Sequence, residues 1–210
     1  MSIIRAIESR NAKNMMAYEK EFADAIRATK ELGMAPGKVI RHKKYALSKE
    51  MADFIQEEIS LIGEILGYEG DVREKNCMRI TCLIVESLRK EFKCLPVVTL
   101  GYVTIDNDDH YKFDLNYVKQ ELAKGPDTTS LNVHCWITFP SDPYFELLDL
   151  TLTSTLSIGS PAGEPVRMSG WFQPEGVFYH PVLVGTGFIR MTAYGPSDFE
   201  MIFDRLHERD

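Results

Sequence analysis

The 210-residue chain lacks the features that mark several specialised protein classes. Its first residues, MSIIRAIESRNAKNMM, carry polar or charged side chains every few positions, so we expect neither a signal peptide nor a membrane anchor. No apolar run approaches the roughly 20 residues of a membrane-spanning helix. Lys and Arg (24) are fewer than Asp and Glu (31), and the formal net charge of -7 disfavours nucleic acid or an anionic membrane as principal partner. We therefore expect a cytoplasmic protein.

Motifs for metals and common cofactors are also missing. The four cysteines include no C-x-x-C pair, so we expect reduced thiols, no disulfide and no structural zinc. The acidic stretch 106–109 lacks the glycine and terminal glutamate of an EF-hand loop and predicts a hairpin tip. The segment 159–163 is not Gly-x-Ser-x-Gly, and 185–187 lacks the third glycine of a dinucleotide loop, so both predict turns. The basic cluster 38–44 is interpreted as a solvated linker. No metal or cofactor is expected.

Four segments have the three- and four-residue apolar spacing of helices. The first runs from Ile3 to Met34, in one or two pieces, and ends at Pro36 and Gly37. The other three are the second helix, capped by Ser48 and ending near Gly67, the third, beginning at Asn76, and a short one from Asp114 to Lys124.

After Cys94 the apolar period changes to two, which is typical of strands. The predicted strands are Val97 to Ile105, Leu131 to Phe139, Phe145 to Leu152, Val177 to Val184 and Gly187 to Ala193. Helices followed by strands indicate an α+β protein in which N-terminal helices pack on an antiparallel β-sheet. At 44% hydrophobic residues, the composition suits one domain with one sizeable core.

Cys77 stands out among the cysteines because it falls in the first turn of the third helix, on the helix face turned toward the protein. Unpaired backbone N–H groups and the helix dipole favour an anion at this end, and Asn76 is a reasonable cap. Cys82 falls deeper in the helix, toward its polar edge. We interpret Cys82, Cys94 and Cys135 as small buried hydrophobic residues.

His134 and Asp149 follow Cys77 on two neighbouring predicted strands. Alternation puts Cys135 on the core face and His134 on the other face. If Phe139 pairs with Tyr144 across the turn, His134 lies directly opposite Asp149, with Cβ atoms roughly 5 Å apart. The carboxylate can then orient the imidazole, and the imidazole can deprotonate a thiol. The three residues together predict a Cys-His-Asp site.

The motifs Asn-Cys at a helix start, LPVVTLGYV, HCW on a strand and LLDLT occur in an order that resembles the transglutaminase-like branch of the papain-like cysteine superfamily. The resemblance implies a papain-like core at about residues 71–155, between a helical part (1–70) and C-terminal strands (156–210). It also implies that Cys77 is the nucleophile, that His134 is the general base and then acid, and that Asp149 orients it. Trp136 fits the family's tryptophan position.

The predicted reaction is acyl transfer through a Cys77 thioester, with hydrolysis of an amide or peptide bond favoured over cross-linking. The substrate would be a protein, a peptide or a small amide. One oxyanion donor would be the Cys77 N–H; Asn76, Tyr68 and Trp136 are candidates for the second donor or the cleft. Two alternatives stay open: a catalytically silent module that binds a protein partner, and an N-acyltransferase that uses acetyl-coenzyme A.

Overall fold

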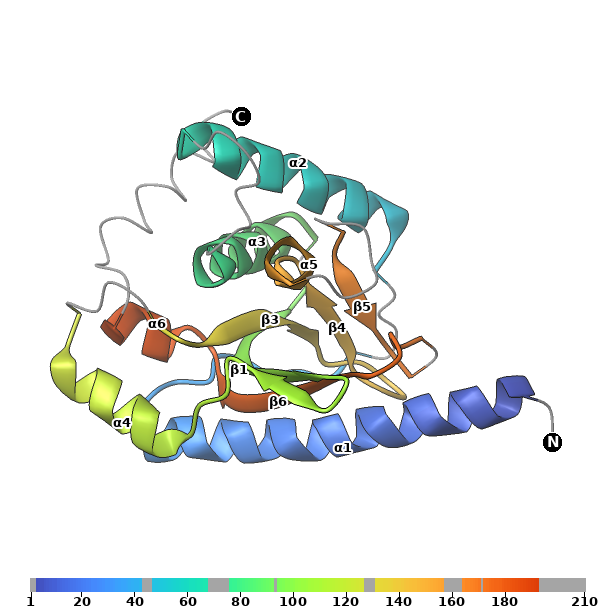
Figure 1. Cartoon of the computed structure of the whole chain (residues 1–210). Helices are drawn as coiled ribbons and strands as arrows, with labels where there is room; N and C mark the ends of the chain where they lie inside the picture. Colours follow the sequence, from blue (N-terminus) through green and yellow to red (C-terminus); the bar gives the residue numbers. More distant parts are fainter. Residues whose placement is uncertain are drawn as a thin grey trace.

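The computed structural model describes residues 3–42, 47–67, 76–92, 94–126, 131–156, 164–170 and 172–192. Helices dominate the first half of this part, and strands the second half (Figure 1). The elements are α1 (Ile3–Glu31), α2 (Lys49–Ile65), α3 (Cys77–Phe92), β1 (Val97–Ile105), β2 (Asp108–His110), α4 (Leu115–Lys124), β3 (His134–Phe139), β4 (Glu146–Asp149), α5 (Leu152–Thr155), β5 (Val166–Met168), β6 (Val177–Val184) and α6 (Gly187–Thr192).

The sheet is antiparallel throughout, with the order β2-β1-β3-β4-β5 and with β6 paired to β1. Strand β6 is late in the chain but pairs with β1, which comes early in the sheet, and β1 is the only described strand that it pairs with. The prediction of an α+β protein with an antiparallel sheet is confirmed.

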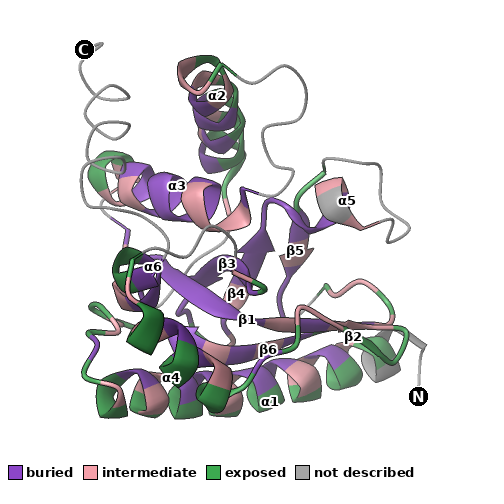
Figure 2. Ribbon diagram, turned by 60° about the vertical axis from the view of Figure 1, so that its left-hand side comes forward, coloured by how far each residue is buried: buried purple, intermediate pink, exposed green. Residues whose placement is uncertain are grey.

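The sheet is covered on both faces (Figure 1). Helices α2 and α3 pack on one face, where they enclose Cys135, Ile137 and Phe139 of β3. Helix α1 packs on the other face against β6, and its apolar side chains meet Trp136. Figure 2 shows that β3, β4 and most of α3 are buried. The expectation that the His134 face of the strand lies away from the core is therefore wrong, because α1 encloses that face as well.

Most of the predicted helix ends are correct. Ser48 caps α2 by accepting a hydrogen bond from the backbone N of Met51, and Asp114 caps α4 by accepting from the backbone N of Asn116 and Tyr117. Helix α1 is one continuous helix of 29 residues. None of the described helices combines the length and apolarity that crossing a bilayer requires.

Gly101 is required where β1 approaches its neighbours most closely. A Cβ atom there would lie 2.0 Å from the His180 carbonyl oxygen and 2.6 Å from Cη2 of Trp136. The register of β1 against β6 also shifts between Leu100 and Gly101, opposite Pro181, which has no N–H to donate. The glycine of the LPVVTLGYV motif thus allows Trp136 and β6 to pack against β1.

Two further sequence interpretations are wrong. The segment predicted as a strand from Gly187 to Ala193 forms helix α6 (Gly187–Thr192), because Phe188 and Ile189 are both buried, a pattern that suits one face of a helix. The basic cluster 38–44 is not simply a solvated linker, because the Arg41 guanidinium pairs with Glu19 and lies 4.9 Å from the centre of the Phe145 ring. The predicted turns at 159–163 lie outside the described residues.

Candidate active site

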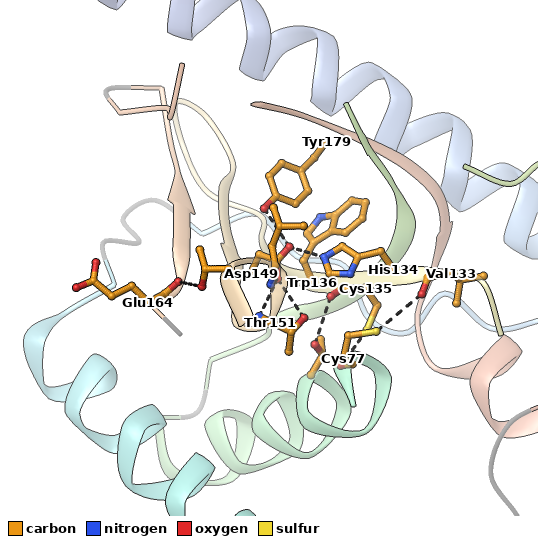
Figure 3. A network of polar contacts seen from close by, with 12 residues as sticks. Cys77, Val133, His134, Cys135, Trp136, Asp149, Thr151, Glu164 and Tyr179 are labelled. Carbon is orange, nitrogen blue, oxygen red and sulfur yellow. Dashed lines mark hydrogen bonds and ion pairs between the residues drawn. The ribbon is translucent and has the colours of Figure 1, made fainter. Parts of the chain in front are cut away.

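His134 and Asp149 are in direct contact beneath the surface. Nε2 of His134 lies 2.5 Å from Oδ2 of Asp149, and the two residues are 2% and 0% exposed. This contact leaves Nδ1 as the ring nitrogen available to a third group. The two side chains therefore form the buried half of the predicted arrangement (Figure 3).

The register that brings them together differs from the predicted one. Phe139 pairs with Glu146 rather than with Tyr144, because the connection between β3 and β4 is two residues longer than assumed. Continuing the observed register sets Asp149 opposite Trp136, so His134 is its diagonal neighbour. A slip of two residues keeps every side chain on its face, whereas a slip of one would not. The predicted pairing was wrong, and the predicted shared face was correct.

Cys77 begins α3 at the edge of this pair, and it is partly exposed, whereas Cys82, Cys94 and Cys135 are buried. Its thiol lies 3.8 Å from the carbonyl oxygen of Val133, the residue before His134. The charge of the His134 ring acts on this thiol and lowers its pKa. The first turn of α3 thus meets the start of β3 (Figure 3).

The thiol of Cys135 lies next to Cys77, a contact that the sequence did not predict. Its Sγ donates to the carbonyl oxygen of Cys77 at 3.2 Å, and its proximity lowers the pKa of the Cys77 thiol. Cys135 is 0% exposed, as expected for a core residue. Because β3 alternates, Cys135 approaches Cys77 from the α3 side of the sheet while His134 approaches from the other side.

The electrostatics of the site favour a charged pair. The hydrogen bond from Cys135, together with the hydrogen bond and charge of His134, outweighs burial and lowers the pKa of Cys77 to about 5. Burial alone would lower the pKa of His134, but the charge and hydrogen bond of Asp149 and the contact with Cys77 raise it to about 10. Between these values the site holds a thiolate and an imidazolium.

Four residues outside β4 hydrogen-bond to the carboxylate of Asp149 and hold it in place. Its Oδ1 accepts from the backbone N of Thr151 and of Leu152, both at 3.0 Å, and its Oδ2 accepts from the hydroxyl of Tyr179 at 3.0 Å as well as from His134. Burial raises the pKa of Asp149, but the charge of His134 and these hydrogen bonds lower it below its ordinary value. The carboxylate is therefore ionised and fixed in orientation.

Two aromatic residues of the site were missed or misplaced by sequence reasoning. The ring of Tyr111 stacks on the ring of His134, with centroids 5.2 Å apart and an interplanar angle of 20°. Tyr111 has a φ of 61°, an uncommon conformation for an aromatic residue. Tyr179 comes from β6, late in the chain. The alternation of β6 predicts a buried Tyr179, but no local signal indicates its partner.

The candidates for the oxyanion site have different outcomes. Trp136 is fully buried and its Nε1 donates to the hydroxyl of Tyr18 at 2.9 Å, so it is not a cleft residue or a free donor. Tyr68 lies outside the described residues. Asn76 is 8% exposed and directly precedes Cys77, and its carbonyl accepts from the backbone N of Ile80.

A cleft of about 370 Å³ is lined by residues that are close in sequence to residues of the site. Lys112 directly follows Tyr111, which stacks on His134, and Asn132 directly precedes Val133, which contacts Cys77. The lining residues are Lys112, Phe113, Asp114, Tyr117 and Asn132. Among the described residues there is no cluster of three or more His, Cys, Asp or Glu that could hold a metal ion.

Comparison with known proteins gives no relative. No family model, no curated protein and no solved structure matches the chain. The resemblance to the transglutaminase-like branch therefore depends on the short sequence motifs around Cys77, His134 and Asp149 alone.

Proposed function

We propose that the protein is a thiol-dependent acyl-transfer enzyme that hydrolyses an amide or peptide bond through a thioester on Cys77. The observation that carries the proposal is the cluster of Cys77, His134 and Asp149: His134 contacts Asp149 at 2.5 Å, the Cys77 thiol lies 3.8 Å from the carbonyl oxygen of the residue before His134, the thiol pKa is lowered and the imidazole pKa is raised. A thiolate nucleophile, an imidazolium acid and an orienting carboxylate are the groups that acyl transfer needs. The likeness of the motifs to those of transglutaminase-like proteins supports the same reaction.

The reaction begins with attack of the Cys77 thiolate on the substrate carbonyl carbon. The negative charge that develops on the carbonyl oxygen lies near the N-terminus of α3, where the first backbone N–H groups have no acceptor within the helix. His134 then gives its proton to the leaving amine, and the carbon–nitrogen bond breaks. Water attacks the thioester while His134 takes one of its protons, which releases the acid and restores the thiolate.

Asp149 and its partners keep the imidazole in one orientation during both steps. The hydroxyl of Tyr179 and the backbone N–H groups of Thr151 and Leu152 hold the carboxylate, so His134 cannot rotate away without losing a buried hydrogen bond. The stacked ring of Tyr111 favours the imidazolium through its π-face and covers one side of the ring. Tyr179 and Tyr111 are thus positioning residues.

The cleft lined by Phe113, Tyr117 and Asn132 is our candidate for the site of the acyl group. Its aromatic walls suit an apolar or aromatic side chain of a protein, a peptide or a small amide. The reaction needs Cys77 in the reduced state, which favours a reducing compartment such as the cytoplasm.

An activated ester tests the proposal without knowledge of the natural substrate. We expect p-nitrophenyl acetate to release p-nitrophenol and to leave one acetyl group on Cys77, detected by intact mass and peptide mapping. Cys77→Ala should abolish the adduct, and His134→Ala should slow acylation by about 10²–10⁴-fold. Cys82→Ala, a change on the same helix, is the matched control and should acylate like the wild type.

The same assay separates the alternatives. An adduct formed from acetyl-coenzyme A would favour an N-acyltransferase. Absence of an adduct from either donor, with a folded protein and a reduced Cys77, would contradict the enzyme and favour a silent module that binds a protein partner.

A further inference from the structure

The pair Cys77 and Cys135 has a property that acyl transfer does not use. Cys135 is a buried thiol on β3, and Cys77 is a partly exposed thiol on α3, so the two come from elements far apart in the sequence. The Sγ atom of Cys135 donates to the backbone carbonyl oxygen of Cys77 at 3.2 Å, so the buried thiol points at the residue that carries the accessible one (Figure 3). Acyl transfer needs a donor near the thiolate but does not need that donor to be a second sulfur.

We propose that Cys77 and Cys135 form a reversible oxidation site, in which a peroxide oxidises Cys77 and Cys135 then closes an intramolecular disulfide. The proposal goes beyond acyl transfer and does not require it, because it depends only on the juxtaposition of one accessible and one buried thiol.

The first step uses the accessible sulfur. The Cys77 thiolate attacks one oxygen of the peroxide, the oxygen–oxygen bond breaks, and the sulfur becomes a sulfenic acid. The leaving hydroxide takes the proton of the His134 imidazolium and departs as water when the peroxide is hydrogen peroxide. Thiolates with a lowered pKa and some exposure are the cysteines that react in this way, and Cys77 meets both conditions.

The second step uses the buried sulfur. Burial, and then the hydrogen bond and charge of the Cys77 thiolate, keep the pKa of Cys135 high, so Cys135 is protonated in the reduced protein. Oxidation of Cys77 to the neutral sulfenic acid removes the charge. Cys135 then attacks the sulfenic sulfur, its proton joins the leaving hydroxide, and one water is released as the sulfur–sulfur bond forms. Two equivalents of an external thiol reverse the bond.

Neither Cys82 nor Cys94 is placed for this chemistry. Burial raises the pKa of Cys82 to about 12, and the thiol of Cys94 donates to the carbonyl oxygen of Leu88 at 3.3 Å. A disulfide at Cys77 would remove the nucleophile of the proposed enzyme. Conversely, it would keep Cys77 from further oxidation to the sulfinic acid, which thiols do not reverse.

Oxidation by hydrogen peroxide, read by intact mass and peptide mapping, tests the proposal. In the wild type we expect the loss of two hydrogens, a peptide linking Cys77 to Cys135, and full recovery with dithiothreitol. Cys135→Ser keeps a hydroxyl donor beside the thiolate but has no sulfur, so Cys77 should gain two oxygens and should not recover. Cys82→Ala should behave like the wild type.

Two results would overturn the proposal. One is a wild type in which Cys77 is oxidised to the sulfinic acid as readily as in Cys135→Ser. The other is a disulfide that involves Cys82 or Cys94 instead. Acylation by p-nitrophenyl acetate, measured on the reduced protein, is independent of both, so a protein that is acylated without forming the disulfide retains the proposed function and loses only this inference.

Discussion

At the scale of single residues, environment distinguishes four chemically identical thiols. Cys77 has a hydrogen-bond donor in Cys135 and a cation in His134, and its pKa falls to about 5. Cys82 is five residues further along the same helix, where burial raises its pKa to about 12. The contrast follows from what each sulfur contacts, because both residues belong to the same helix.

The first prediction concerns the alkylation rate of Cys77. We expect iodoacetamide to label Cys77 with a pH midpoint near 5, well below the ordinary thiol value of 9.0, because only the thiolate reacts. His134→Ala should move this midpoint upward, since it removes a hydrogen bond and a positive charge. Peptide mass spectrometry across pH 4 to about 9 would measure it. Equal, slow labelling of all four cysteines would contradict the prediction.

The position of Cys77 could be predicted from sequence, and its neighbours could be predicted in part. Helical periodicity identified a cysteine in a first turn, and strand alternation placed His134 and Asp149 on one face. The roles of Cys135, Tyr111 and Tyr179 could not be predicted, because each depends on a contact between elements that are distant in the chain.

At the scale of elements, local patterns correctly predicted most helices and strands, but they did not correctly predict how the strands pair. Strands β1 and β6 have the predicted ends, whereas the register of β3 against β4 was wrong by two residues. The length of the turn decides register, and a turn composition does not specify its length. Segment 187–192 was misassigned because its short apolar run fits a strand as well as a helix.

A series of buried side-chain hydrogen bonds links α1 to the centre of the sheet. The hydroxyl of Tyr18 accepts from Nε1 of Trp136 at 2.9 Å and lies 2.5 Å from Oγ1 of Thr138, which in turn lies 2.7 Å from Oγ1 of Thr99. All four residues are buried. Because each of these polar atoms has a partner, the hydrogen bonds fix how α1 lies on β3 and β1.

The second prediction concerns this link. Tyr18→Phe should lower the free energy of unfolding by about 1–3 kcal/mol, because it leaves the indole N–H of Trp136 buried without its acceptor. Urea unfolding would measure the loss. Tyr102→Phe, a change on the partly exposed side of β1, is the control and should be nearly neutral. Iodoacetamide labelling of Cys77 should stay unchanged in both variants, because neither hydroxyl contacts the site. Equal stability of Tyr18→Phe and Tyr102→Phe would mean that packing, not hydrogen bonding, holds α1.

At the scale of the whole molecule, the site lies where separate layers meet. Cys77 comes from the helical layer above the sheet, His134 and Asp149 come from the sheet, and Tyr179 comes from the strand against which α1 packs (Figure 1). The thiolate and imidazolium therefore exist together only in the folded chain, and unfolding returns each group to its ordinary pKa. Stability must then depend on pH through these groups.

The sign of this dependence follows from the two pKa shifts. Cys77 is lowered from 9.0 to about 5, so its contribution to stability is complete above pH 9.0 and is lost as the pH falls through about 5. His134 is raised from 6.5 to about 10, so its contribution is complete below pH 6.5 and is lost as the pH rises through about 10. Where the two ranges overlap, from 6.5 to 9.0, the slopes cancel, because folding moves a proton from sulfur to nitrogen without net uptake.

The third prediction compares the wild type with Cys77→Ala over this range. We expect the stability of the wild type relative to the variant to increase as the pH rises from about 5 to about 8, since the variant lacks the thiol contribution and retains much of the His134 contribution. Urea midpoints at several pH values would measure the difference, and all other titrating groups are common to both proteins. Parallel stability curves would mean that Cys77 is a protonated thiol in the folded protein, and the charged pair that the proposed reaction requires would be absent.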